Sequence, residues 1–155
     1  MNLRLAPLSP EDEDFIYRLY ASTRMAEIAG FGWNQAQQEA FLRMQFNAQK
    51  RWYEMAYPGA EYTVVLRDEQ PVGRMIVLRG AQEFHLIDIA LLPEHRGCGI
   101  GTALVGELIA ESRRAAVPLA LQVLKSNRAV HLYQRLGFIR SGEDEMYYQM
   151  RANPA

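Results

Sequence analysis

The chain has 155 residues, of which 49% are hydrophobic and 23% are charged, and its formal net charge is −1. This length allows one domain with a substantial core, and the composition is that of an ordinary soluble protein. The small net charge gives no basic field for nucleic acid, and no run of about 18 apolar residues could span a membrane. We therefore expect a single globular domain over residues 1–155 that binds neither nucleic acid nor membrane.

Cysteine usage and the first residues bear on compartment and metal content. The one cysteine, Cys98, cannot form an internal disulfide, and three histidines without cysteine partners do not make a zinc site. The opening residues 1–5 lack the apolar segment of a secretory signal and are typical of a strand. We expect a cytoplasmic protein with no metal.

The first sixty residues are predicted to form one strand and two helices. Residues 2–8 are typical of a strand, and Ser9-Pro10 marks a helix start. Residues 30–33 interrupt the helical pattern, and Asn34 is a candidate cap for a second helix that ends near Tyr57. This second helix is aromatic and amphipathic, with an apolar face expected from Phe41, Met44, Trp52 and Met55.

The remaining chain is predicted to alternate strands and helices. The expected strands are residues 61–67, 72–79, 84–92, 118–124, 138–141 and 146–150, and the expected helices are residues 100–115 and 127–136. The element order is thus one strand, two helices, three strands, a helix, a strand, a helix and two strands.

A glycine-rich loop stands between the strand of residues 84–92 and the helix of residues 100–115. Gly97, Gly99 and Gly101 fall within five residues, so the backbone can turn tightly and point several N–H groups at an anion. A P-loop would need a Lys after the last glycine, and a dinucleotide fingerprint would need Gly or Ala where Leu104 stands. The loop is therefore interpreted as a pyrophosphate cradle outside those two nucleotide motifs.

Two motifs resemble one family. Arg96-x-x-Gly99-x-Gly101 behind Pro93-Glu94 resembles the acyl-CoA signature of the GNAT superfamily of N-acyltransferases. In residues 126–138 an Asn starts a helix and a Tyr then precedes a Gly-Phe pair, which resembles the C-terminal GNAT motif. The resemblance covers residues 62–150 well and the first sixty residues in helix count.

The resemblance implies an α/β (α+β) fold, with a mixed, mostly antiparallel central sheet of about seven strands flanked by about four helices. It implies an N-acetyltransferase that moves acetyl from acetyl-CoA to a primary amine by direct attack in a ternary complex. It places the pantetheine arm against backbone groups of Ile89, Ala90 and Leu91. The other cofactor-binding residues would be Arg96, Gly97, Cys98, Gly99, Ile100, Gly101, Thr102 and Asn127.

Acyl transfer also needs an acid, an oxyanion donor and a base. Tyr133 is the candidate general acid, because a thiol pKa near 8.5 and a phenol pKa near 10 differ by only about 1.5; the alternative is a core tyrosine whose hydroxyl is tied to backbone. A backbone N–H near Ala90 or Leu91, freed by a splay or bulge, would stabilise the oxyanion.

The base is open among Asp88, Glu83, His85 and water, and Asp88 is favoured because a carboxylate inside a buried strand is costly without a role. Members acting on ribosomal-protein N-termini carry a Glu where this chain has Gln122. Asn127 is also the expected helix N-cap.

The acceptor is expected to be an amine of a small molecule, peptide or protein. The resemblance implies that Glu27, Phe31 and Trp33 wall its site, and ordinary core packing is their alternative role. A non-catalytic acyl-CoA-binding module and an interaction protein that uses the aromatic first sixty residues are the rival functions. A homodimer is common among folds with exposed C-terminal hairpins.

Overall fold

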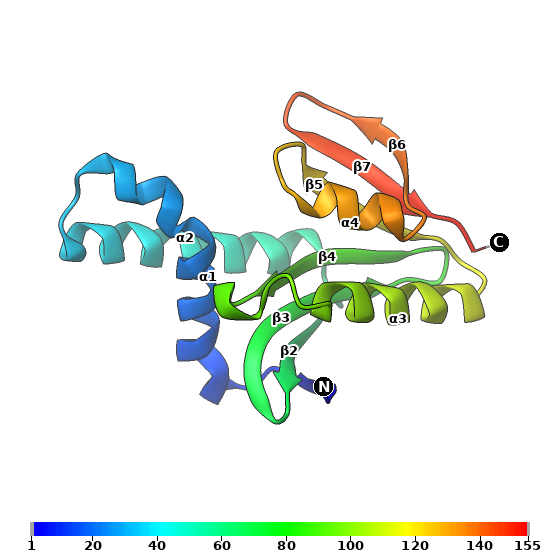
Figure 1. The fold of residues 1–155 in the computed structure, drawn as a ribbon, viewed down its shortest axis with the longest axis horizontal. Coiled ribbons are helices and arrows are strands. Elements are labelled where there is room, and N and C mark those ends of the chain that lie inside the picture. The colour runs from blue at the N-terminus through cyan, green and yellow to red at the C-terminus, as the bar shows by residue number, and fades with distance from the viewer. Residues whose placement is uncertain (1, 155) are drawn as a thin grey trace. The chain divides into compact units, whose positions relative to one another are not determined.

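The computed structural model describes residues 2–154 as seven strands and four α-helices, joined in part by short 3₁₀ turns (Figure 1). The elements are β1 (Leu3–Pro7), α1 (Glu13–Ile28), α2 (Gln35–Ala56), β2 (Glu61–Arg67), β3 (Gln70–Arg79), β4 (Phe84–Leu91), α3 (Ile100–Arg114), β5 (Leu119–Leu124), α4 (Ala129–Arg135), β6 (Ile139–Glu143) and β7 (Tyr147–Ala152). The predicted element order is confirmed.

The strands form one sheet in the order β1-β2-β3-β4-β5-β7-β6. β1–β2, β5–β7 and β6–β7 pair antiparallel, whereas β4–β5 pairs parallel. The predicted fold class, a mixed and mostly antiparallel seven-stranded sheet with four helices, is confirmed.

Several predicted boundaries were wrong by a few residues. Residues 10–12 form a 3₁₀ turn, so the first helix starts at Glu13. β3 starts at Gln70 because Asp68 and Glu69, with φ of 50° and 67°, make a two-residue turn whose twist suits a hairpin. α4 starts at Ala129 rather than at residue 127.

The structure divides into two compact units. Unit 1 contains the residues up to Met75 together with Ile89–Arg96, and unit 2 contains Ile76–Asp88 together with the residues from Gly97 on. β3 and β4 each contribute residues to both. The single domain expected over residues 1–155 stays a prediction.

In unit 1, the core lies where α1 crosses α2 (Figure 1). α1 buries Phe15, Ile16 and Leu19 on one face. The ring of Phe46 on α2 packs against Tyr17 and Tyr20 of α1 at centroid distances of 5.6 and 5.5 Å.

The buried side chains of α2 are Leu42 and Phe46, and of the four apolar residues named for this helix only Phe41 packs against the core. Met44, Trp52 and Met55 are exposed. The packing against α1 selects residues four apart on another stripe of the same helix.

In unit 2, alternate residues of β5, Leu119, Leu121 and Val123, are buried as expected for a strand that covers a core with one face. α3 buries a stripe at helical spacing that includes Leu104 and Leu108. β7 pairs with β5 on one side and β6 on the other, and a register shift between Arg140 and Gly142 marks a bulge at the outer edge.

Candidate active site

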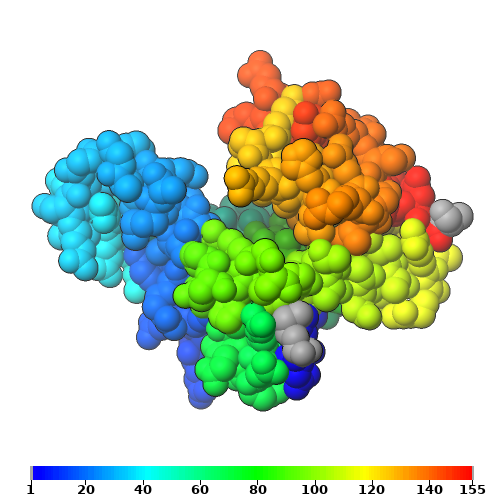
Figure 2. All heavy atoms as spheres, viewed as in Figure 1, coloured from blue at the N-terminus to red at the C-terminus, as the bar shows by residue number. Residues whose placement is uncertain are grey.

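The glycine loop forms an open turn at the start of α3. Gly97 and Gly99 have φ of 73° and 91°, which side chains other than glycine adopt at a cost. A Cβ at either position would meet nothing within 4 Å, so the conformation and not crowding demands glycine. Both residues are exposed, and Figure 2 shows this light green segment at the surface of the face in view.

Backbone groups in the first turn of α3 are the donors that this loop offers. Ala103 N–H donates to the Gly99 carbonyl, which closes the first helical turn. The N–H groups of Ile100, Gly101 and Thr102 stand before that bond and have no helix carbonyl ahead of them. Ile100 has a buried side chain, so only its backbone can face a ligand. The turn can therefore bind an anion through main-chain atoms and the helix dipole.

Arg96 is anchored to the end of β4. Its Nε donates to the Leu91 carbonyl at 2.9 Å, and the residue is exposed. The guanidinium is thereby held beside the strand end by one of its five donors. Ile89, Ala90 and Leu91 themselves are half-buried residues of β4.

Tyr133 on α4 is buried, with 5% of its surface exposed, and its ring packs against Phe138 at 5.5 Å. Burial raises the pKa of Tyr133 to about 12, and the negative charge of Asp88 adds a smaller rise. The difference between the pKa of Tyr133 and that of a thiol is thus wider than the ordinary values of the two groups predict. A core role, with the hydroxyl tied to backbone, stays the alternative for this residue.

Asp88 is the candidate base that the structure brings into electrostatic contact with Tyr133. It is half-buried on β4, two residues beyond the last β4–β5 pair, Leu86↔Leu121. The parallel ladder therefore ends before Ile87 and Asp88, although both strands continue. The sequence predicts that strand β4 separates from its neighbour further along, near Ala90 or Leu91, so that a backbone N–H is freed there.

The other two base candidates have different surroundings. Glu83 forms an ion pair with Arg151 at 2.8 Å, with both side chains half-exposed. His85 is half-buried, and burial lowers its pKa although the charge of Glu83 opposes that effect. The ring of His85 is therefore neutral near pH 7 and can accept a proton.

A residue that the sequence analysis missed, Gly73 on β3, fixes the end of β4. A Cβ at this position would lie 2.4 Å from the Ala90 carbonyl oxygen. Leu92 N–H donates to the Val72 carbonyl at 2.9 Å, which keeps the two strands together there. A glycine inside an otherwise apolar strand was the available signal, because it often marks a close backbone approach.

The three predicted acceptor residues lie in unit 1 around the α1–α2 connection. Glu27 forms an ion pair with Arg24, with 3.0 Å between Glu27 Oε2 and Arg24 Nε. Trp33 packs edge-on against Phe31 at 5.0 Å and against Phe41 at 5.1 Å. Phe31 is 55% exposed, so at least one aromatic surface here is open to a ligand.

Asn127 is exposed, and its side-chain oxygen accepts from Ala129 N–H at 2.9 Å. It thus caps α4 from two residues before the helix, whereas the N-cap position itself is Arg128; the predicted N-cap position was wrong by one residue. Cys98 and Thr102 are exposed in the cradle. Gln122 is exposed on β5 and pairs with Gln149 of β7.

Two kinds of feature are absent from residues 2–154. No cluster of three or more His, Cys, Asp or Glu side chains could hold a metal ion there. No helix in the same residues has the length and apolar character that crossing a bilayer requires.

The fold defines an α/β protein with an open glycine turn at a strand–loop–helix junction. Residues 15–138 match the model of the acetyltransferase (GNAT) family. Because this match covers most of the chain, the chain belongs to that family, and the predicted family is confirmed.

Two curated relatives align with parts of the chain. It is 35% identical over 85 residues to [ribosomal protein bS18]-alanine N-acetyltransferase of Haemophilus influenzae, covering 54% of this chain and 58% of that protein. It is 39% identical over 74 residues to streptothricin acetyltransferase of Streptomyces lavendulae, covering 46% of this chain and 39% of that protein. The chain thus spans less than two thirds of either relative.

Solved structures share the fold over the whole chain. The PaiA N-acetyltransferase of Thermoplasma acidophilum, solved in complex with coenzyme A, superposes with a TM-score of 0.73 at 18% identity, covering 99% of both chains. An acetyltransferase of Thermus thermophilus superposes with a TM-score of 0.70 at 21% identity, covering 99% of this chain and 97% of that chain. At these identities the likeness shows the fold alone.

Proposed function

We propose that the protein is an N-acetyltransferase that transfers acetyl from acetyl-CoA to a primary amine by direct attack in a ternary complex. The observation that carries this proposal is Tyr133, a buried tyrosine on α4 that lies within electrostatic reach of Asp88. A buried titratable group whose pKa is shifted by burial and by a nearby carboxylate is typical of functional sites, and this supports a chemical role for Tyr133.

The cradle suits the pyrophosphate of acetyl-CoA. Its two left-handed glycines leave open space above the backbone, and the first turn of α3 offers N–H groups at the positive end of a helix dipole. Arg96 adds a positive charge beside the loop, and Asn127 is a further polar contact in this proposal. Backbone groups of Ile89, Ala90 and Leu91 would hold the pantetheine arm.

Acetyl-CoA supplies an activated acetyl group and a thiolate leaving group. In the proposed mechanism Asp88, directly or through water, takes the proton that the amine must lose, since only about one alkylamine in a thousand is neutral at pH 7. A backbone N–H near Ala90 or Leu91 donates to the carbonyl oxygen as negative charge develops there. Tyr133 donates its hydroxyl proton toward the departing sulfur.

The high pKa of Tyr133 bears on its proposed role. At about 12, the phenol remains protonated across the neutral range, so it is always a hydrogen-bond donor. Complete transfer of its proton to a thiolate would be uphill by about 5 kcal/mol for a thiol pKa near 8.5. We therefore assign Tyr133 stabilisation of the developing thiolate through a hydrogen bond, with full transfer only as the bond to carbon breaks.

The acceptor in this proposal is an amine with an apolar or flat portion. Its support is the exposed ring of Phe31 and the aromatic row that continues through Trp33 to Phe41. The names of the two relatives include an alanine of ribosomal protein bS18 and streptothricin, so both a protein or peptide and a small molecule belong in the test.

The test is transfer of isotopically labelled acetyl from acetyl-CoA to fractionated bacterial extract, followed by mass spectrometry. We expect label in an amine-bearing fraction. Tyr133→Phe should cut turnover at least about tenfold while leaving acetyl-CoA affinity nearly intact. Tyr147→Phe, on β7, is the matched control and should behave as the unaltered protein. Unchanged turnover in Tyr133→Phe would refute the role of this hydroxyl.

Asp88 on β4 and Glu83, the residue just before β4, allow a matched test of the base. Asp88→Asn should lower turnover at least about tenfold, with the loss most marked below the amine's pKa. Glu83→Gln likewise replaces a carboxylate by an amide, but four residues before the point at Ile87 where β4 and β5 stop pairing, and it should have a small effect. A larger loss in Glu83→Gln than in Asp88→Asn would move the base to Glu83. Binding of acetyl-CoA without any label transfer would favour the rival function of a non-catalytic acyl-CoA-binding module.

A further inference from the structure

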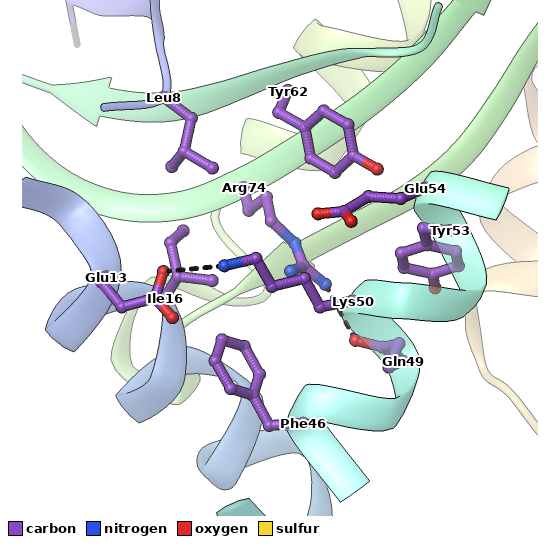
Figure 3. A pocket seen from close by; sticks show the side chains of 10 residues that line it. All are labelled: Leu8, Glu13, Ile16, Phe46, Gln49, Lys50, Tyr53, Glu54, Tyr62 and Arg74. Atoms are coloured by element: carbon purple, nitrogen blue, oxygen red, sulfur yellow. Dashed lines mark hydrogen bonds and ion pairs between the residues drawn. The ribbon is translucent and has the colours of Figure 1, made fainter. Parts of the chain in front are cut away.

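Unit 1 contains a pocket of about 250 Å³ that the proposed chemistry does not use (Figure 3). It lies between the first turns of α1, the second half of α2 and the strands β2 and β3. Its lining residues are Leu8, Glu13, Ile16, Phe46, Gln49, Lys50, Tyr53, Glu54, Tyr62 and Arg74. The pocket combines an apolar wall with two charges of each sign.

The hydroxyl of Tyr62 is an unsatisfied polar atom of this pocket. Its oxygen is buried and has no hydrogen-bond partner, which within residues 2–154 holds for no other buried side-chain nitrogen or oxygen. A buried polar atom without a partner destabilises the folded state relative to a hydrogen-bonded one. Such an atom in a cavity wall calls for an explanation, and a bound ligand would supply the missing partner.

Arg74 is the second unusual residue, since it is a charged side chain that is only 8% exposed. It donates to the Gln49 side-chain oxygen at 3.4 Å. A guanidinium carries five N–H donors, so it can hold Gln49 and a carboxylate at the same time. Figure 3 shows the side chains of Arg74, Lys50 and Glu54 projecting into the space between the strands and the two helices.

The remaining charges differ in how they are engaged. Lys50 and Glu13 pair with each other at 3.7 Å. Glu54 is exposed. After burial, which raises the pKa of Tyr62 most, the charge of Glu54 raises this pKa and the charge of Arg74 lowers it, so both charges lie near the Tyr62 hydroxyl. The pocket thus places a cationic and an anionic group around one buried hydroxyl.

Net charge in the pocket selects among ligand classes. The four charges of the lining cancel, so a purely anionic ligand would meet the like charge of Glu54 and a purely cationic ligand would meet the like charge of Arg74. A molecule with one carboxylate and one ammonium group satisfies both. The apolar wall of Leu8, Ile16 and Phe46 adds room for an aliphatic portion.

We propose that this pocket binds a small zwitterion with an apolar side chain, such as a free aliphatic α-amino acid. Its carboxylate accepts from Arg74 and the Tyr62 hydroxyl, its ammonium group donates to Glu54, and its side chain packs on Ile16 and Phe46. This site goes beyond acetyl transfer and depends on none of the residues assigned to that reaction. Binding therefore needs no acetyl-CoA.

The experiment is calorimetric titration of the full chain with three matched probes, without acetyl-CoA. L-leucine carries both charges, 3-methylbutylamine lacks the carboxylate, and 4-methylpentanoate lacks the ammonium group. We expect L-leucine to bind at least about tenfold more tightly than either analogue, because each removes one charged partner. Binding of an analogue as tight as that of L-leucine, or no heat with L-leucine up to about 10 mM, would overturn the proposal.

Two conservative variants locate the binding. Tyr62→Phe and Glu54→Gln should each weaken L-leucine binding at least about fivefold, because each loses a hydrogen bond to a charged group. Their controls are Tyr147→Phe and Glu107→Gln, which alter the same residue types in unit 2. Thermal unfolding checks folding, and Tyr62→Phe should be as stable as the unaltered protein or more so, since it removes an unsatisfied hydroxyl. L-leucine binding that survives both variants would place the ligand elsewhere and refute the site.

Failure here and failure of the proposed function are separable. Tyr133→Phe should leave L-leucine binding unchanged, and Tyr62→Phe should leave acetyl transfer unchanged in the absence of L-leucine. A variant of either pair that abolishes both readouts would show a general loss of structure and would be seen in the unfolding curve.

Discussion

The cradle before α3 and the pocket of unit 1 are two candidate ligand sites built from opposite materials. The cradle is made of backbone groups at exposed glycines within a few consecutive residues. The pocket is made of side chains from residues that lie as far apart in the chain as Leu8 and Arg74. The cradle therefore depends on backbone conformation, and the pocket depends on which side chains the fold brings together.

This difference predicts how each site responds to substitution. Main-chain donors survive most side-chain changes, so the cradle should fail chiefly where a residue alters φ or blocks the approach of a ligand. Side-chain donors are lost one at a time, so the pocket should fail gradually as its polar groups are removed.

Gly73 fixes the distance between β3 and the end of β4, and Gly73→Ala should have the largest effect. The new methyl group would meet the Ala90 carbonyl 2.4 Å away, so β3 and the end of β4 must move apart. We expect a loss of about 2–3 kcal/mol in the free energy of unfolding, measured in urea, with weaker binding of both coenzyme A and L-leucine. Wild-type stability and binding in Gly73→Ala would contradict the close approach of the two strands.

Tyr133 combines a motif visible in the sequence with a pKa set by packing, and its alkaline titration is the next largest effect. Folding raises its pKa from 10.0 to about 12, so the neutral phenol stabilises the folded state fully below about pH 10. This contribution, about 2–3 kcal/mol, is lost as the pH rises toward 12.

The measurement is the free energy of unfolding at several values between about pH 9 and pH 12. Tyr133→Phe should decline less steeply than the unaltered protein over this range, and Tyr147→Phe should follow the unaltered protein. Parallel curves for Tyr133→Phe and the unaltered protein would contradict the raised pKa.

Gly99→Ala should weaken the cradle through strain alone. Its φ of 91° costs a residue with a Cβ roughly 1–2 kcal/mol, and relaxation of the loop would misdirect the N–H groups of the first turn. We expect coenzyme A affinity to fall about tenfold in calorimetry, with L-leucine binding unchanged.

Gly106→Ala is the matched control for this substitution. Gly106 lies inside α3, and a Cβ there would meet nothing within 4 Å. Since Ala favours helices over Gly by about 1 kcal/mol, this variant should be more stable and bind coenzyme A normally. Equal affinity losses in the two glycine variants would mean that φ at Gly99 is not what maintains the site.

Arg96→Met should have the smallest effect. The residue is exposed, so its charge contributes to phosphate binding in a screened environment. We expect coenzyme A affinity to fall about threefold at low salt, with less difference at high salt. A salt-independent loss would indicate that the bond from Arg96 to the Leu91 carbonyl, and not its charge, is what matters.

The element order and the cradle could be predicted because their signals are local. The spacing of apolar residues predicts each strand and helix, and three glycines within five residues predict a turn before a helix. The apolar face of α2 could not be predicted in the same way, because Met44, Trp52 and Met55 have the right spacing yet α1 packs on Leu42 and Phe46. Amphipathic spacing allows several stripes, and only the neighbouring helix selects one.

Residue types and spacings alone determined the family, the order of elements and the position of the glycine turn before α3, because these depend on short-range backbone preferences. The tertiary structure decided the pKa of Tyr133, the early end of the β4–β5 ladder, the approach of Gly73 to Ala90 and the unit 1 pocket. Each of these arises from groups distant in the chain whose burial and separation follow from packing. The spacing of neighbouring residues does not predict the distances between such groups, so only the folded structure gives them.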